Sequence, residues 1–106
     1  MIDGDTFRLD SGERIRIAGI DSPESQPGNA KCASEIVRGK AATQTAIALL
    51  KGRTVRFVRV GRSYARTVAR VEVDGRDLGT TLVANGVADW WPRGKPKPDW
   101  CHRQVD

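Results

Sequence analysis

The feature that most constrains the fold of this chain is a succession of short runs in which apolar and polar residues alternate, each ended by turn-forming residues. Residues 6–9 alternate in this way, and the Asp-Ser-Gly sequence at residues 10–12 supplies a turn. The run Arg14–Ile17 alternates again, so its two arginines share the face opposite its two isoleucines. We therefore predict a β-hairpin over residues 5–20.

One helical pattern interrupts the strands. Apolar residues recur at helical spacing over residues 39–50, and Gly52 is placed to cap the end of a helix there. Runs rich in valine and phenylalanine then indicate two strands, at residues 54–60 and 67–73, with a short connection at 61–64. The sequence therefore predicts one main helix among several strands.

Turn and capping residues organise the last part of the chain. The Asp-Gly pair at 74–75 is the strongest hairpin signal, Asp77 can cap a short second helix, and the Asn-Gly pair at 85–86 can close it. Residues 90–106 are rich in proline and lysine and show no regular pattern. We predict one domain over residues 1–89, a mainly β fold with helices arranged as a small strand-rich barrel. A C-terminal tail over residues 90–106 follows it.

The chain is basic and shows no apolar run suited to a membrane. Its 106 residues carry 18 Lys+Arg against 13 Asp+Glu, a formal net charge of +5. A basic surface favours an anionic partner, most often nucleic acid, although ordinary solvated charge is the alternative. No apolar run approaches the roughly 20 residues that span a bilayer, and the start shows no signal-peptide pattern. We expect a nucleic-acid partner, no membrane partner and a monomer.

The two cysteines, Cys32 and Cys101, lie far apart in the sequence and form no Cys-x-x-Cys pair. His102 is the only histidine, so a zinc site of two cysteines and two histidines cannot be built from this chain. A disulfide that ties the tail to the body is the preferred interpretation. Two unrelated free thiols, or a zinc site on Cys32, Cys101 and His102, are the alternatives.

Three carboxylates are placed so that chain folding can bring them together. Asp5 begins the first predicted strand, Asp21 ends the returning one, and Glu24 follows across a turn that contains Pro23. Clustered carboxylates repel one another unless a cation or protons lie between them. Oxygen ligands with no histidine or cysteine nearby in sequence indicate a hard divalent ion, Ca²⁺ or Mg²⁺, with coordination positions left for water and substrate oxygen.

Two arginines complete a site suited to a phosphodiester. Arg16 lies in the hairpin and Arg66 begins a later strand. A guanidinium group can bind two phosphate oxygens at once, and a metal with two arginines would balance the charge that develops in phosphoryl transfer. The plainer alternatives are that residues 3–5 form a simple turn and residues 21–24 a loop cap.

Five segments of the chain resemble the staphylococcal nuclease (thermonuclease) family, in the right order and near the expected spacing. They are Ile2–Leu9, Arg14–Glu24, Tyr64–Ala69, Val73–Leu78 and Leu82–Ala88. The resemblance is to a small bacterial member and covers most of residues 2–88. It implies an OB-fold, which is a five-stranded Greek-key barrel packed with one main helix and a second short helix.

The resemblance also implies a calcium-dependent phosphodiesterase that acts on DNA and/or RNA. Such an enzyme cleaves on the 5′-oxygen side and leaves 3′-phosphates, with Mg²⁺ and Mn²⁺ as other candidate ions. The alternative is a catalytically weak or inert OB-fold module that binds single-stranded nucleic acid. We favour the enzyme, because a pure binder has no need for the three carboxylates and both arginines together.

The resemblance implies a metal-binding role for one group of residues. Asp5 and Asp21 would bind the ion directly, and Ser22 would offer its backbone carbonyl. Glu24 would contact the ion through water and is the family's proposed general base. Asp3 stands at another acidic position near the ion.

A second group of residues would bind the phosphate. By resemblance, Arg16 would bridge the phosphate, Arg66 would stabilise the developing charge, and Tyr64 would help to hold a terminal phosphate. One departure from the family lies beside them, because Ala65 stands where the family usually has glycine. We expect strain at Ala65 if that position requires a positive φ.

The cysteines resemble those of a subset of small bacterial family members, which have one cysteine before the helix and a terminal Trp-Cys. This resemblance supports the pairing of Cys32 with Cys101. Disulfides persist in oxidising compartments, so we expect a secreted or periplasmic protein.

Overall fold

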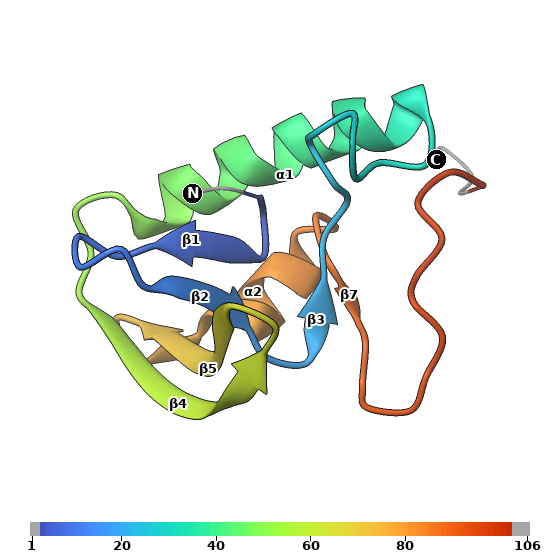
Figure 1. The fold of residues 1–106 in the computed structure, drawn as a ribbon. Coiled ribbons are helices and arrows are strands. Elements are labelled where there is room, and N and C mark those ends of the chain that lie inside the picture. Colours follow the sequence, from blue (N-terminus) through green and yellow to red (C-terminus); the bar gives the residue numbers. More distant parts are fainter. Residues whose placement is uncertain (1–2, 103–106) are drawn as a thin grey trace.

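The computed structural model describes residues 3–102 and arranges them as mainly β structure with two helices (Figure 1). The strands are β1 (Thr6–Arg8), β2 (Arg14–Ile17), β3 (Ile20–Asp21), β4 (Val55–Ser63), β5 (Arg66–Val73), β6 (Arg76–Asp77) and β7 (Asp89–Trp90). The helices are α1 (Ala33–Leu50) and α2 (Leu78–Ala84). The predicted combination of strands with one long and one short helix is therefore confirmed.

The strands form two hydrogen-bonded groups. The larger is a five-stranded sheet in the order β1-β2-β5-β4, with β6 paired to β5, and the smaller is the β3–β7 pair. The β2–β5 pairing is parallel, whereas the other pairings are antiparallel. In Figure 1, α1 runs along one side of the sheet, and β3 and β7 stand together beyond the end of β2. Neither helix in residues 3–102 is long and apolar enough to cross a membrane.

The core lies where α2 and the inner faces of β2 and β5 meet. Its most deeply buried large side chains are at most 1% exposed, and they are Ile15, Ile17, Ile20, Val71, Leu78 and Leu82. The alternation predicted over residues 14–17 is confirmed, because the isoleucines of β2 are buried and its arginines are not. The outer face of β2 is therefore free to present charged side chains.

Helix α1 begins at Ala33 rather than at the predicted residue 39, so that part of the prediction is wrong. Its first turns lack an apolar stripe and are held by polar contacts. The Glu35 carboxylate is 3% exposed and accepts a hydrogen bond from the Lys31 backbone N–H at 2.9 Å. Sequence periodicity does not report such contacts, because they depend on the loop before the helix.

Strand β4 continues to Ser63 and takes up most of the predicted connection at residues 61–64, so the predicted end of the strand at residue 60 is wrong. The register against β5 shifts between Arg59 and Gly61, so Val60 is the extra residue of a bulge and Gly61 stays paired, with Val68. The turn to β5 is therefore only two residues long. It consists of Tyr64 and Ala65, because Ser63 is already paired with Arg66.

The turn and cap predictions of the last third are confirmed. Asp74 and Gly75 have φ of 52° and 82°, as a tight hairpin between β5 and β6 requires. The Asp77 carboxylate accepts a hydrogen bond from the Thr80 backbone N–H at 2.9 Å and caps α2. Gly86, just past α2, has φ of 75°.

The C-terminal segment packs against the rest of the chain. Trp90 lies in β7 and pairs with Ile20, so the absence of regular structure predicted from residue 90 onward is wrong at its first residue. The chain then loops outward and returns to the start of α1 (Figure 1). Trp100 is 4% exposed, and Cys101 forms a disulfide with Cys32. The preferred cysteine pairing is confirmed, and the free-thiol and zinc alternatives are wrong.

We expect the double substitution Cys32→Ser, Cys101→Ser to lower the free energy of unfolding by roughly 2–5 kcal/mol. The disulfide joins residues 69 apart in sequence, and removing it restores conformational freedom to the unfolded chain. Urea denaturation of the variant and of the oxidised protein measures the change. The reduced wild type is the control and should unfold near the midpoint of the variant. Equal midpoints for the variant and the oxidised protein would contradict the prediction.

Candidate functional site

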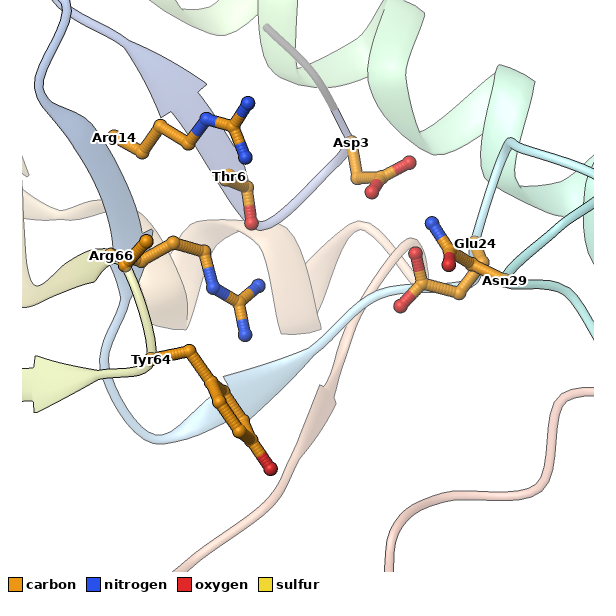
Figure 2. A pocket seen from close by; sticks show the side chains of 8 residues that line it. Asp3, Thr6, Arg14, Glu24, Asn29, Tyr64 and Arg66 are labelled. Carbon is orange, nitrogen blue, oxygen red and sulfur yellow. The ribbon is translucent and has the colours of Figure 1, made fainter.

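An open pocket of about 490 Å³ lies beside the turn between β4 and β5 (Figure 2). Four of the residues singled out from the sequence line it: Asp3, Glu24, Tyr64 and Arg66. In Figure 2 the guanidinium group of Arg66 points into the pocket from one side, and the carboxyl group of Glu24 lies on the other. The fold therefore brings a candidate base and a candidate phosphate-binding arginine to the same pocket.

The β4–β5 turn positions Arg66. As the first residue of β5, Arg66 pairs with Ser63, so its side chain starts at the rim of the pocket. Tyr64 has φ of 56°, and its side chain is 95% exposed at the same rim. Among residues 3–102, Tyr64 and Asp74 are the non-glycine residues with positive φ. Ala65 is not one of them, so the condition for strain at that position, a positive φ, is not met.

Sequence reasoning missed three further residues of this pocket: Thr6, Arg14 and Asn29. Arg14 matters most, since in Figure 2 it extends toward the pocket on the same side as Arg66. The signal was present in the alternation of β2, which places Arg14 and Arg16 on one face. Two arginines thus face two carboxyl groups across the pocket.

The pKa of the Glu24 carboxyl group is raised toward neutral pH. Burial raises the pKa of Glu24, and a side-chain hydrogen bond with Asp3 and the charge of Asp3 raise it further, to about 7. The charge of Asp5 adds to the rise of this pKa, and that of Lys97 opposes it. A carboxyl group with a pKa near neutral pH can both accept and return a proton, as general acid–base catalysis requires.

Helix α1 holds the backbone of Glu24 in two ways. The Glu35 carboxylate accepts a hydrogen bond from the Glu24 backbone N–H at 3.0 Å. Gly39 lies one turn further along, where a Cβ atom would come within 2.4 Å of the Glu24 carbonyl oxygen. A glycine inside a helical pattern signals such a close approach, although it does not reveal what approaches. The position of Glu24 therefore depends on a helix to which sequence reasoning gave no role.

Asp5 and Asp21 lie beside the pocket and share one arginine. The Nη2 atom of Arg16 is 3.4 Å from Asp5 Oδ2 and 3.6 Å from Asp21 Oδ1. Its Nη1 atom donates hydrogen bonds to the carbonyls of Ile17 and Ile20, at 3.1 and 3.0 Å. Arg16 therefore joins the start of β1 to the end of β3.

Other donors complete the surroundings of Asp5. Its Oδ1 accepts a hydrogen bond from the Thr6 hydroxyl at 2.9 Å, and its Oδ2 accepts one from the Ser22 backbone N–H at 3.1 Å. Burial raises the pKa of Asp5, and the charge of Arg16 opposes that rise. The buried Ser22 hydroxyl makes no hydrogen bond with any of the residues that the structure describes.

The C-terminal segment supplies two further partners of Asp21. Lys97 Nζ lies 2.7 Å from Asp21 Oδ1, and the Trp100 indole donates to Asp21 Oδ2 at 2.8 Å. The Asp21 side chain is only 1% exposed. Neither contact was foreseen, because 76 and 79 residues separate these partners from Asp21.

The three predicted carboxylates are not gathered into one cluster. Across residues 3–102, no three His, Cys, Asp or Glu side chains lie close enough together to hold a metal ion. Asp5 and Asp21 converge on Arg16, whereas Glu24 faces the pocket with Asp3. The donors of Asp5 and Asp21 are oxygens, the type that hard divalent ions prefer, and the Ser22 hydroxyl beside them is unpartnered. The donor type therefore fits Ca²⁺ or Mg²⁺, while Arg16, Lys97 and Trp100 contact these oxygens in this structure.

Comparison with known families identifies the family of the chain. A family model described as "Staphylococcal nuclease homologue" matches residues 14–100. The chain belongs to this family. The match includes Arg16, Asp21, Glu24 and Arg66, and it leaves Asp5 outside. No curated protein matches the chain.

Membership of the staphylococcal nuclease homologue family confirms the resemblance read from the sequence. The OB-fold is the fold of this family, so that prediction is confirmed as well. Members are typically nucleases and generally depend on calcium. Membership therefore indicates a nuclease or nucleic-acid-binding function for this chain.

Arg16 also borders a second groove, which adjoins the C-terminal segment. The groove has a volume of about 610 Å³, and Trp91 and Arg93 line it together with Arg16. The Arg16 guanidinium carbon lies 5.5 Å from the centre of the Trp91 ring, and Lys97 Nζ lies 5.2 Å from it. Arg16 therefore lines this second groove, beside the pocket of Arg66, and its positive charge lies over an aromatic ring.

We expect Gly39→Ala to destabilise the protein by about 1–3 kcal/mol, although alanine is the better helix former. The added methyl group would overlap the Glu24 carbonyl and push it away from α1. Urea denaturation measures the loss. Gln44→Ala, at an exposed position of the same helix, is the control and should change stability by less than about 0.5 kcal/mol. A Gly39→Ala protein more stable than the wild type would contradict the close approach.

The pKa of Glu24 predicts a pH-dependent stability in metal-free buffer. The folded protein has a pKa of about 7 at Glu24, against an ordinary value of 4.5, so between these values it binds more protons than the unfolded chain. The free energy of unfolding therefore falls as the pH rises through this range. We expect Glu24→Gln to raise Tm most above about pH 7 and to lose this advantage near about pH 4.5.

Thermal unfolding of both proteins across this range tests that expectation. Glu72→Gln, which replaces an exposed carboxyl group on β5, is the matched control. The difference in Tm between Glu24→Gln and the wild type should grow with pH, whereas that of the control should stay constant. A constant difference for Glu24→Gln would show that its carboxyl group titrates normally in the folded protein.

Proposed function

We propose that this protein is a calcium-dependent nuclease that hydrolyses phosphodiester bonds of DNA or RNA. It would cleave on the 5′-oxygen side and leave 3′-phosphates. The observation that carries the proposal is the pocket in which Glu24 and Arg66 lie on opposite sides, beside the buried pair Asp5 and Asp21. A phosphodiester in this pocket would have a base on one side and a guanidinium group on the other.

The arginines of the pocket bind and stabilise the phosphate. Arg66 and Arg14 can each offer paired N–H donors to phosphate oxygens, and their charge is permanent. Negative charge grows on the equatorial oxygens as the phosphorus is attacked, so donors already in place lower the barrier. Tyr64, exposed at the rim, is positioned to contact a terminal phosphate.

Glu24 is the proposed general base. Its carboxylate accepts a proton from water, and the water oxygen bonds to phosphorus. The bond from phosphorus to the 5′ oxygen breaks, and that oxygen takes a proton from solvent water to become a hydroxyl group. In the metal-free protein a pKa of about 7 already leaves a substantial fraction of Glu24 ionised at neutral pH, so a carboxylate is present to take the proton. Glu35 and Gly39 support this role by fixing the backbone of Glu24 against α1.

Asp5 and Asp21 would hold the ion, with the Ser22 backbone carbonyl as a further oxygen ligand. When bound, Ca²⁺ would supply positive charge beside a phosphate oxygen, and Mg²⁺ and Mn²⁺ are other candidates. Arg16, which contacts both aspartates, would balance charge next to the phosphate. Asp3 contributes through its hydrogen bond with Glu24.

One observation favours a second function, that of an inert module that binds single-stranded nucleic acid. Arg16 and Lys97 already neutralise Asp5 and Asp21, and the groove beside them is basic and contains Trp91. Such a groove suits a phosphate backbone with a base stacked on the indole. This module would bind nucleic acid and leave it intact.

The disulfide supports a place for the protein in an oxidising compartment, outside the cell or in the periplasm. Small proteins of such compartments use disulfides to supplement a limited hydrophobic core. We propose that the protein acts there as a monomer on nucleic acid.

We expect Glu24→Gln and Arg66→Ala each to lower kcat for cleavage of single-stranded DNA by about 100-fold or more. The first removes the proton acceptor, and the second removes a donor to the developing charge. Cleavage by the wild type should require added calcium and stop with a chelator. Gel assays of a labelled oligonucleotide, with Tm measured for each protein, test both statements.

Arg70→Ala is the matched control, because Arg70 is an exposed arginine of the same strand that lies outside the pocket. Its kcat should stay within about threefold of the wild type. Undiminished cleavage by folded Glu24→Gln would reject the assignment of the base. Wild-type protein that binds the oligonucleotide without cleaving it, with or without calcium, would establish the binding module instead.

A further inference from the structure

Lys97 makes an unusual contact for a lysine in an irregular segment. Its ammonium group lies 2.7 Å from Asp21 Oδ1, whose side chain is 1% exposed, while the side chain of Lys97 itself is 34% exposed. The same oxygen lies 3.6 Å from Arg16 Nη2, and the side chain of Arg16 is only 12% exposed. Of the two cations on Asp21, Lys97 therefore has the readier access to water.

Neighbouring contacts hold Lys97 near Asp21 without a helix or strand. Trp100, three residues later, is buried and donates to the other oxygen of Asp21. Cys101 is joined to Cys32 by the disulfide, and the Lys97 ammonium also lies over the Trp91 ring. Lys97 is thus tethered beside Asp21, and its flexible stem lets the ammonium move without unfolding the segment.

A divalent ion and the Lys97 ammonium cannot share Asp21 Oδ1 at low cost. Calcium binds carboxylate oxygens at about 2.3–2.6 Å, which is close to the distance at which Lys97 now lies. Two cations against one oxygen atom would repel each other strongly at a site so poorly exposed to water. One of them has to withdraw, and the more exposed Lys97 loses the least by doing so.

We propose that Lys97 is a tethered counter-charge that neutralises Asp21 and is displaced when a divalent cation binds, so that Lys97 lowers the affinity of the site for calcium. Trp100 keeps its hydrogen bond to Asp21 throughout and preserves the orientation of the carboxylate. This inference rests on the proposed function, because it takes Asp21 to be a ligand of the ion. It assigns to the C-terminal segment a role in setting the calcium concentration at which the protein works.

Calcium affinity tests the inference directly. Isothermal titration of calcium chloride into the Lys97→Met protein should give a Kd about tenfold lower than that of the wild type. Methionine preserves an unbranched stem over Trp91 and removes the charge. Lys95→Met removes the same charge from the same segment, at a residue outside the ion pairs of Asp21, and its Kd should stay within about twofold of the wild type. Lys97→Arg, which keeps the charge, should restore the wild-type Kd to within about threefold.

Thermal unfolding separates a displaced counter-charge from a merely structural ion pair. Without calcium, Lys97→Met should have the lower Tm, since buried Asp21 loses a partner. With saturating calcium the difference in Tm should vanish, because Lys97 no longer contacts Asp21 in either case. A structural ion pair that persists with calcium would lower the Tm equally under both conditions and would overturn the inference.

The remaining outcomes distinguish this inference from the proposed function. Wild type and Lys97→Met with equal Kd values for calcium overturn the role of Lys97 and leave the metal site standing. Absence of calcium binding by every protein at millimolar concentration overturns both. Calcium binding by Lys97→Met, with none detected for the wild type, would support the inference, because Lys97 would then keep the ion out of the site.

Discussion

The neutralisation of two buried carboxylates is the constraint on which the rest of the structure depends. Asp5 and Asp21 are at most 4% exposed, and an unpaired buried charge is strongly destabilising. Arg16 reaches both of them, and Lys97 reaches Asp21 from the C-terminal segment. The start of β1, the ends of β2 and β3, and the C-terminal segment therefore meet at one charged centre. A fold arranged in this way already holds the oxygen donors that a hard cation prefers.

In the pocket beside this centre, the arginines proposed to bind phosphate and the proposed base lie on opposite sides. Arg66 and Arg14 come from paired strands of the sheet, whose hydrogen bonds hold them rigidly on the positive side. Glu24 lies in a loop, and a loop needs outside support if a side chain is to be placed accurately. That support comes from α1, through the Glu35 carboxylate and the close packing of Gly39. The helix thus fixes the backbone position of Glu24, as strand pairing fixes those of the arginines.

The parts of the fold that could be predicted are those that local chemistry decides. Alternation located β1 and β2, and the Asp-Gly pair and the Asp77 cap located the β5–β6 turn and the start of α2. The predictions failed where a partner distant in sequence decides, as at the early start of α1 and at the end of β4. For the site, reasoning from charge pointed to Glu24 and Arg66, and the family resemblance added Asp3 and Tyr64; all four line one pocket. Their catalytic roles stay predictions.

By itself, the sequence determined the order of the strands and helices, the family, and the residues able to carry the chemistry, because turn geometry, side-chain alternation and motif spacing are local properties. Only the tertiary structure decided which charges face one another. It placed Arg16 between two aspartates, Arg14 in the pocket and Lys97 on Asp21. These contacts join residues as much as 76 positions apart. They depend on how the chain packs as a whole. A buried charge is strongly destabilising without a partner, and the tertiary structure decides which partner lies beside it.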